Sequence, residues 1–83
     1  INIFRIINVI LFLSFQRNLK CYQIAKLYYK VKDYNSAIKY INRYILVSSN
    51  SAAAFRLLGD CYFALNLKDK AFNSYKVSIS VCF

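Results

Sequence analysis

Apolar residues recur at intervals of three and four positions through residues 18–80, which places them on one face of an α-helix. The pattern predicts four helices, at about residues 18–31, 34–47, 52–65 and 68–80. Asp33 is expected to cap the second helix, and Asn50 or Ser51 the third, because short polar side chains accept the unpaired N–H groups of a first turn. One predicted stripe, on the first helix, is expected to pack against a partner stripe on the second: Ile24, Leu27, Tyr28 and Val31 against Ile38, Ile41 and Ile45.

The second half of the chain repeats the first at a distance of 34 residues. Tyr28 recurs as Tyr62, and Ala37 recurs as Ala71. Other paired positions keep their class: Ile24 with Leu58, Ala25 with Gly59, Tyr29 with Phe63, Val31 with Leu65, Ile38 with Phe72, Ile41 with Tyr75 and Ile45 with Ile79. This period, with small and aromatic residues in a fixed order, resembles tetratricopeptide repeats, each of which is a helix–turn–helix. The resemblance implies an all-α, right-handed solenoid with repeats at 17–51 and 52–80.

The repeated positions have steric roles. A small residue on each helix of a pair lets the two helices approach closely, and a tyrosine on the first helix fills the space beside it. The expected structural set is Ile24, Ala25, Tyr28, Ala37, Ile41, Leu58, Gly59, Tyr62, Ala71 and Tyr75.

Two repeats are fewer than the roughly three that a solenoid needs to bury a stable core. Below about 70–80 residues a single core rarely supplies more than about 3–5 kcal/mol, so this chain alone should be marginally stable. We therefore expect a fragment of a longer array. Neither end carries a polar capping helix, so both end faces should expose apolar side chains, which predicts neighbouring repeats or aggregation.

Composition narrows the possible functions. Hydrophobic residues make up 59% of the chain, which excludes disorder caused by low hydrophobicity. The net charge of +9 favours acidic proteins, nucleic acid or an anionic membrane surface as partners. Histidine is absent, only three residues are acidic, and no phosphate-binding glycine motif is present, so we expect no enzyme, cofactor or metal site. Cys21, Cys61 and Cys82 form no CxxC motif and are expected to be reduced thiols.

In tetratricopeptide arrays the first helix of each pair lines the concave face, so the resemblance implies a groove. Its expected residues are Tyr22, Lys26, Tyr29, Lys30, Arg56, Asp60 and Phe63. This surface is open to three interpretations: a solvated helix face, a site for an extended acidic or aromatic peptide, or a site for single-stranded RNA. Repeats that grip the C-terminal carboxylate of cytosolic chaperones carry Lys and Asn where this chain has Tyr22, Lys26 and Leu57, so we expect no chaperone co-factor role.

The sequences "IAKLYYKVKDYNSAIKYINRYILV" (24–47) and "AAAFRLLGDCYFALNLKDKAFNSYKVSI" (52–79) resemble the N-terminal repeats of the large Ran-binding nucleoporins of the cytoplasmic pore filaments. The resemblance implies a scaffold at the cytoplasmic face of the nuclear pore, with nucleoporins or neighbouring repeats as partners and roles in pore assembly and nucleocytoplasmic transport. That family's Ran-binding domains, phenylalanine–glycine repeats and SUMO ligase segment have no counterpart here. The alternative is a cytoplasmic peptide-binding adaptor, possible also in a membrane-anchored form.

Residues 1–16 differ from the rest, since they contain one charge, at Arg5, and a ten-residue apolar run. Such a run is too short to span a bilayer but has the length of a signal-peptide core. The segment has three interpretations: translated intron beside an exon at 17–80, a genuine apolar helix, or a signal or anchor. The end of "LFLSFQ" and the "VC" of the 81–83 tail can be encoded by splice-site sequences. This favours the interpretation as translated intron.

Overall fold

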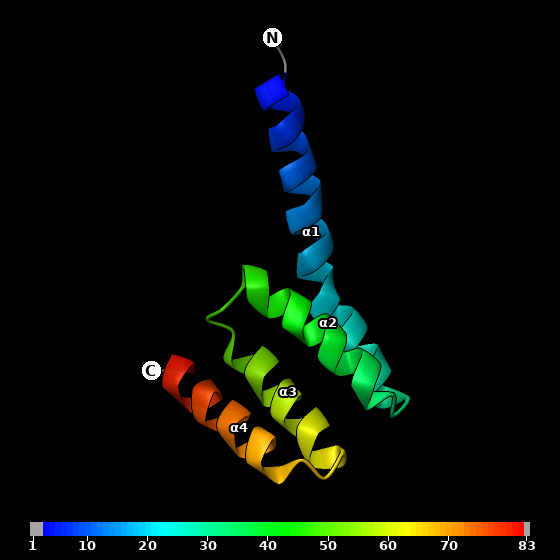
Figure 1. Ribbon diagram of the computed structural model, residues 1–83, viewed down its shortest axis with the longest axis vertical. Helices are drawn as coiled ribbons and strands as arrows, with labels where there is room; N and C mark the ends of the chain where they lie inside the picture. Colours follow the sequence, from blue (N-terminus) through cyan, green and yellow to red (C-terminus); the bar gives the residue numbers. More distant parts are fainter. Residues whose placement is uncertain (1–2, 83) are drawn as a thin grey trace.

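The computed structural model describes residues 3–82, including the side chains of residues 3–11, 13 and 20–81. Within this range lie four helices: α1 (Ile3–Lys30), α2 (Tyr34–Val47), α3 (Ala52–Ala64) and α4 (Lys68–Cys82). Each helix packs against the next along the chain, so two helix pairs stack in sequence order (Figure 1). The all-α architecture of helix–turn–helix repeats is confirmed.

Side chains predicted to cap helices do so at the second and third helices. The Asp33 carboxylate accepts a hydrogen bond from the Ser36 backbone N–H at 3.3 Å. The Ser51 hydroxyl accepts one from the Ala54 N–H at 3.2 Å, so the third helix is capped by Ser51 and not by Asn50. Each cap satisfies a first-turn donor that has no partner within its helix.

The turn that ends the first helix of a pair is also repeated after 34 residues. Lys32 and Asn66 both adopt the left-handed conformation, with φ of 66° and 65°. The next residue donates back to the helix: Asp33 N to the Tyr28 carbonyl at 3.0 Å, and Leu67 N to the Tyr62 carbonyl at 2.8 Å. This is the Schellman motif that satisfies terminal carbonyls, here built without glycine.

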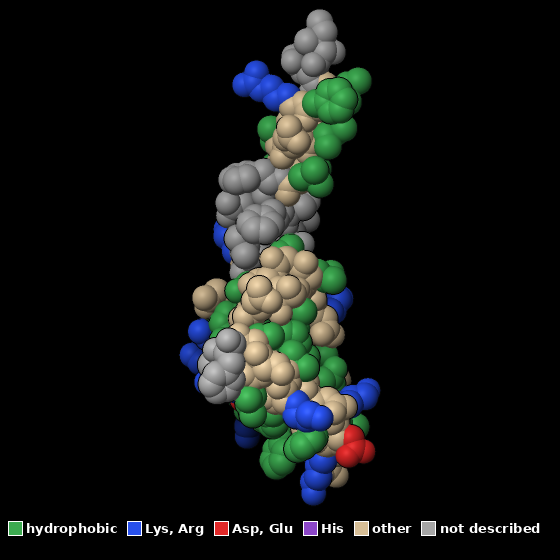
Figure 2. Space-filling view, turned by 90° about the vertical axis from the view of Figure 1, so that its left-hand side faces the viewer, with side chains coloured by type: hydrophobic (Ala, Val, Ile, Leu, Met, Phe, Trp, Pro, Cys, Tyr) green, Lys and Arg blue, Asp and Glu red, His purple; other side chains and the backbone are tan. Residues whose placement is uncertain are grey.

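The first helix is longer than predicted. It begins at Ile3 and not near residue 18, because the segment holds no proline or glycine that would end a helix there. Its first part extends beyond the other helices (Figure 1) and exposes apolar side chains (Figure 2), which are Ile3, Phe4, Ile6, Ile7, Val9, Ile10, Leu11 and Leu13. Whether residues 1–16 and 81–83 are translated intron stays a prediction, and residues 1, 2 and 83 lie outside the described part. No helix described here is long and apolar enough to cross a membrane.

Small residues predominate in the core between the helices. Its buried members are Ala25, Ala37, Ile41, Ala54, Leu58 and Cys61. Tyrosines pack around the alanines of the first repeat: the Tyr28 ring stacks on Tyr40 with centroids 5.4 Å apart, and Tyr22 packs on Tyr44 at 5.3 Å. In the second repeat, α4 also contributes small buried residues, which are Ala71, Ser74 and Ser78.

Gly59 allows the closest approach within the second pair. A Cβ atom on Gly59 would lie 2.7 Å from Cε1 of Tyr75, well inside ordinary contact distance. The 34-residue offset places Ala25 and Ile41 at the same two positions in the first repeat, and both belong to the core. The two repeats therefore combine a larger residue on one helix with a smaller one on the other.

Both end faces of the helix stack are apolar and exposed, as predicted. On α1, Leu27 and Val31 are 62% and 71% exposed, so the prediction that they pack against α2 is wrong. On α4, Phe72 and Ile79 are 63% and 62% exposed. The residues of the stripe predicted on α1 therefore have different environments: Tyr28 stacks on Tyr40 of α2, whereas Leu27 and Val31 are exposed.

Candidate functional site

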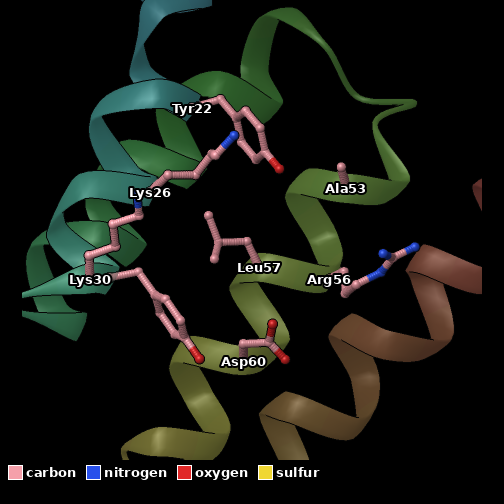
Figure 3. Close-up of a pocket in the computed structure, with 8 residues that line it drawn as sticks. Tyr22, Lys26, Lys30, Ala53, Arg56, Leu57 and Asp60 are labelled. Carbon is pink, nitrogen blue, oxygen red and sulfur yellow. The ribbon is translucent and has the colours of Figure 1, made fainter. Parts of the chain in front are cut away.

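A hollow of about 270 Å³ lies between α1 and α3 (Figure 3). It brings together all the predicted groove residues except Phe63, which is 61% exposed and lies outside it. Two further lining residues, Ala53 and Leu57, were not predicted as groove candidates. Helical spacing contained that signal, since positions 53, 56, 57 and 60 share one face of a helix. The complete lining is Tyr22, Lys26, Tyr29, Lys30, Ala53, Arg56, Leu57 and Asp60.

The hollow exists because the two first helices of the repeats are held apart. The second helix packs against both of them, whereas α1 and α3 touch each other only slightly. Their facing sides therefore remain open between the two rows of side chains. Figure 3 shows Tyr22 extending from α1 and Leu57 extending from α3 into this space, with the Arg56 side chain directed away from α1.

The charge of the hollow is mainly positive. Lys26, Lys30 and Arg56 are exposed cations, and Asp60 is the only acidic residue of the lining. The Lys26 ammonium lies 5.2 Å from the centre of the Tyr22 ring, a cation–π arrangement. Three positive charges against one negative charge attract an anionic partner.

Asp60 also joins α3 to α4. Its carboxylate accepts a hydrogen bond from the Tyr75 hydroxyl. Burial, this hydrogen bond and the charge of Asp60 raise the pKa of Tyr75 to about 12. Burial, followed by the charge of Asp60, also raises the pKa of Tyr29. Tyrosine hydroxyls are protonated at neutral pH even without such a shift, so both can donate hydrogen bonds, and the Tyr75 hydroxyl donates to Asp60.

Cys61, which follows Asp60 on α3, has low reactivity. Cys61 is a free thiol with no exposed surface, and burial, with a smaller effect from Asp60, raises its pKa to about 11. A thiol in this state is a poor nucleophile at neutral pH. Cys21 is also buried, and the side chain of Cys82 lies outside the described part. No cluster of potential metal ligands occurs among the residues that the structure describes.

A second hollow, of about 330 Å³, lies on the outer face of α1. It is lined by Ile24, Leu27, Tyr28 and Val31, all of them apolar or aromatic. This hollow belongs to the exposed end face of the first repeat, on the side of α1 that lacks a helix partner in the described chain.

Comparison with known proteins agrees with this architecture. Residues 21–51 match the family model described as tetratricopeptide repeat. The chain is 39% identical over 66 residues to E3 SUMO-protein ligase RanBP2 of Homo sapiens, and 35% identical over 68 residues to that of Drosophila melanogaster. It is also 38% identical over 66 residues to the human RANBP2-like and GRIP domain-containing protein 8.

These matches each cover 80% of this chain. The chain, in turn, spans only about 2% of the length of the RanBP2 proteins and 4% of the GRIP-domain relative. The likeness therefore concerns one short helical segment of much longer proteins. Residues 21–51 are thus a tetratricopeptide repeat, and the helix pairs and the sequence likeness show that the chain resembles one short segment of RanBP2.

Proposed function

We propose that this chain is one segment of a longer tetratricopeptide array that serves as a protein interaction scaffold at the cytoplasmic face of the nuclear pore. Tetratricopeptide repeats are protein interaction modules, and the 39% identity to RanBP2 over 66 residues supports the location at the pore. The single observation that carries the scaffold role is the pair of exposed apolar end faces.

The chain itself contains the pattern for covering the α1 face. Leu27 of α1 corresponds after 34 residues to Cys61 of α3, and Ile24 corresponds to Leu58. Cys61 and Leu58 are buried, and α3 packs against α2. Leu27 is 62% exposed. Its face of α1 has no helix against it in the described chain, whereas α2 covers the equivalent face of α3. A preceding repeat would supply such a helix.

The exposed face of α4 indicates a following repeat in the same way. Phe72 and Ile79 correspond to Ile38 and Ile45 of α2, which pack against the core. Both α4 side chains are more than 60% exposed, at spacings that keep them on one stripe. An isolated protein rarely leaves apolar faces open at both ends, so these faces fit an array that continues in both directions.

The test is to locate the parent protein in cells with a fluorescent tag. Wild type should mark the nuclear rim, and deletion of residues 17–80 should reduce that signal. Leu27→Asp and Phe72→Asp should act similarly by blocking repeat stacking, whereas Asn73→Asp, at an exposed position beside Phe72, should have no effect. A wild-type protein spread through the cytoplasm would favour the adaptor alternative, and one on other membranes the anchored alternative; either result would refute the pore proposal.

A further inference from the structure

We infer that this chain assembles head to tail with further copies of itself, the exposed face of α4 in one copy packing on the outer face of α1 in the next. The inference goes beyond the scaffold role proposed above, since it names a second copy as an occupant of the two end faces, and it does not depend on location at the pore. Its basis is the internal interface between α2 and α3, through which the two repeats of one chain already pack. The residues concerned are Ile24, Leu27 and Val31 on α1 and Phe72 and Ile79 on α4.

The 34-residue period makes the internal interface a template for a contact between copies. In the second repeat α4 has the place that α2 has in the first, and α1 from residue 18 onward has the place of α3. An α4 packed on the α1 of a second copy therefore has the same order of helices as α2 packed on α3. The residues that line the internal interface thus identify those that would line the interface between copies.

The outer face of α1 carries the receiving side of this interface. Leu58 and Cys61 of α3 belong to one buried cluster with residues of α2. Their equivalents on α1 are Ile24, which is half-buried, and Leu27, which is 62% exposed. Both line the hollow of about 330 Å³ on the outer face of α1. Since an apolar cavity of about 150 Å³ can hold benzene, this hollow has room for an aromatic side chain.

The exposed face of α4 carries the inserting side. Ile38 and Ile45 of α2 are half-buried and pack against the core cluster. Their equivalents on α4, Phe72 and Ile79, are 63% and 62% exposed and lie seven residues apart on one stripe. Packing α4 on the α1 of a second copy would cover this stripe as the internal interface covers its counterpart, and Phe72 is the aromatic side chain that the α1 hollow would receive.

Positive charge limits the strength of this contact. Lys20 stands where α3 has Ala54, which is fully buried, so the interface between copies meets a long cation where the internal one has a methyl group. Lys76 corresponds to Asn42, which stays exposed in the internal interface, so its ammonium can remain in water. Each copy also carries a net charge of +9. Apolar contact therefore drives assembly and charge opposes it, so salt should strengthen assembly by screening the repulsion.

The contact joins two different faces, so it is heterologous. Each added copy leaves one α1 face and one α4 face free, and assembly continues beyond two copies into an open chain or a closed ring. The projecting part of α1 at residues 3–13 is also apolar, but it has no equivalent in the second repeat and therefore no internal interface as a template. It extends beyond the other helices (Figure 1), away from the outer face of α1 at residues 24–31.

The test is sedimentation velocity of the 83-residue chain from about 5 to about 200 μM, over which the average mass should rise at least about twofold. Leu27→Asp and Phe72→Asp each place a carboxylate in one face and should each weaken association at least about tenfold. Asn73→Asp makes the same charge change at an exposed position beside Phe72 and should change association by less than about twofold. A wild-type chain that is monomeric at every concentration, or equal losses in all three variants, would overturn the inference.

Mixing the two blocked variants tests the head-to-tail arrangement. Leu27→Asp keeps its α4 face and Phe72→Asp keeps its α1 face, so an equimolar mixture should form a one-to-one complex that grows no further. Self-association retained by Phe72→Asp alone would show α1 faces pairing with each other, and retention by Leu27→Asp alone would show the same for α4. Retention by both would assign association to another surface, such as the projecting part of α1. Each of these three results would overturn the inference.

The charged position at the interface gives a variant with the opposite effect. Lys20→Ala restores the alanine of the internal interface and should strengthen association about fivefold, whereas Lys39→Ala, which removes the same charge from an exposed position on α2, should strengthen it less than about twofold. Equal effects of the two would contradict the register, as would association that weakens when salt is raised. All substituted side chains are exposed, so helicity by circular dichroism should be unchanged in every variant. These results are independent of localisation, so they can fail while the pore proposal stands, and the reverse.

Discussion

Substitution of Gly59 by alanine tests the closest helix contact of the fold. The added Cβ would lie 2.7 Å from Cε1 and 2.8 Å from Cδ1 of Tyr75, whereas carbon atoms normally approach to about 3.5–4.0 Å. The Tyr75 ring does not move freely, because its hydroxyl donates to Asp60. Either the two helices separate, or the ring shifts and weakens that hydrogen bond.

Two opposing terms set the expected free-energy change for Gly59→Ala. Overpacking a well-packed contact costs about 1–3 kcal/mol. Alanine, in turn, favours a helix interior over glycine by about 1 kcal/mol. If the ring moves instead, the loss is that of a hydrogen bond to a charged group, about 1.5–3 kcal/mol. The expected net result is a loss of up to about 2 kcal/mol in the free energy of unfolding.

The assay is urea unfolding followed by circular dichroism. Asn73→Ala compared with Asn73→Gly, at an exposed position within α4, measures the helix preference without the contact. Combining Gly59→Ala with Tyr75→Ile recreates the alanine and isoleucine that the first repeat has at Ala25 and Ile41, and should recover about 1 kcal/mol relative to additive effects. A Gly59→Ala chain that gains stability as the Asn73 pair does, or strictly additive effects, would refute the steric reasoning.

Three further outcomes are expected. Lys32→Gly should raise stability by about 0.5–1 kcal/mol in urea unfolding and Lys32→Val should lower it, because residue 32 has φ of 66°; equal stabilities would contradict the strain. The folded chain holds the Tyr75 proton more tightly than the unfolded chain, with a pKa of about 12 against 10.0, so stability should be intact below pH 10 and fall as the pH rises toward 12. Tyr75→Phe should flatten that fall, and an unchanged pH profile would argue against the pKa shift. Cys61 should react with a thiol reagent at pH 8 only after unfolding, and rapid labelling of the native chain, located by mass spectrometry, would contradict its burial.

The candidate groove was expected because the resemblance to tetratricopeptide arrays implies that the first helix of each pair lines a concave face. Side chains three and four positions apart on a first helix share a face, so helical spacing alone groups Tyr22, Lys26 and Tyr29. Phe63 shows the limit of that reasoning: its position follows the same spacing, but the hollow ends at Asp60. Leu57 was missed as a lining residue although helical spacing places it on the same face as Arg56 and Asp60, whereas the end of the hollow depends on how far apart the two helices are held.

Local pattern was sufficient for the order of the helices, the 34-residue period and the cap at Asp33, since each depends on the residues of the chain itself, but it left Asn50 and Ser51 both open as the cap of α3. Local pattern could not predict which apolar faces are buried and which are exposed. Leu27 and Cys61 occupy equivalent positions, yet one is exposed and the other buried, because α2 covers α3 and no described helix covers α1 in the same manner. The contact of Gly59 with Tyr75, and of Tyr75 with Asp60, likewise arises only when α3 and α4 pack together, since burial and close contact depend on neighbours in space and not on neighbours in sequence.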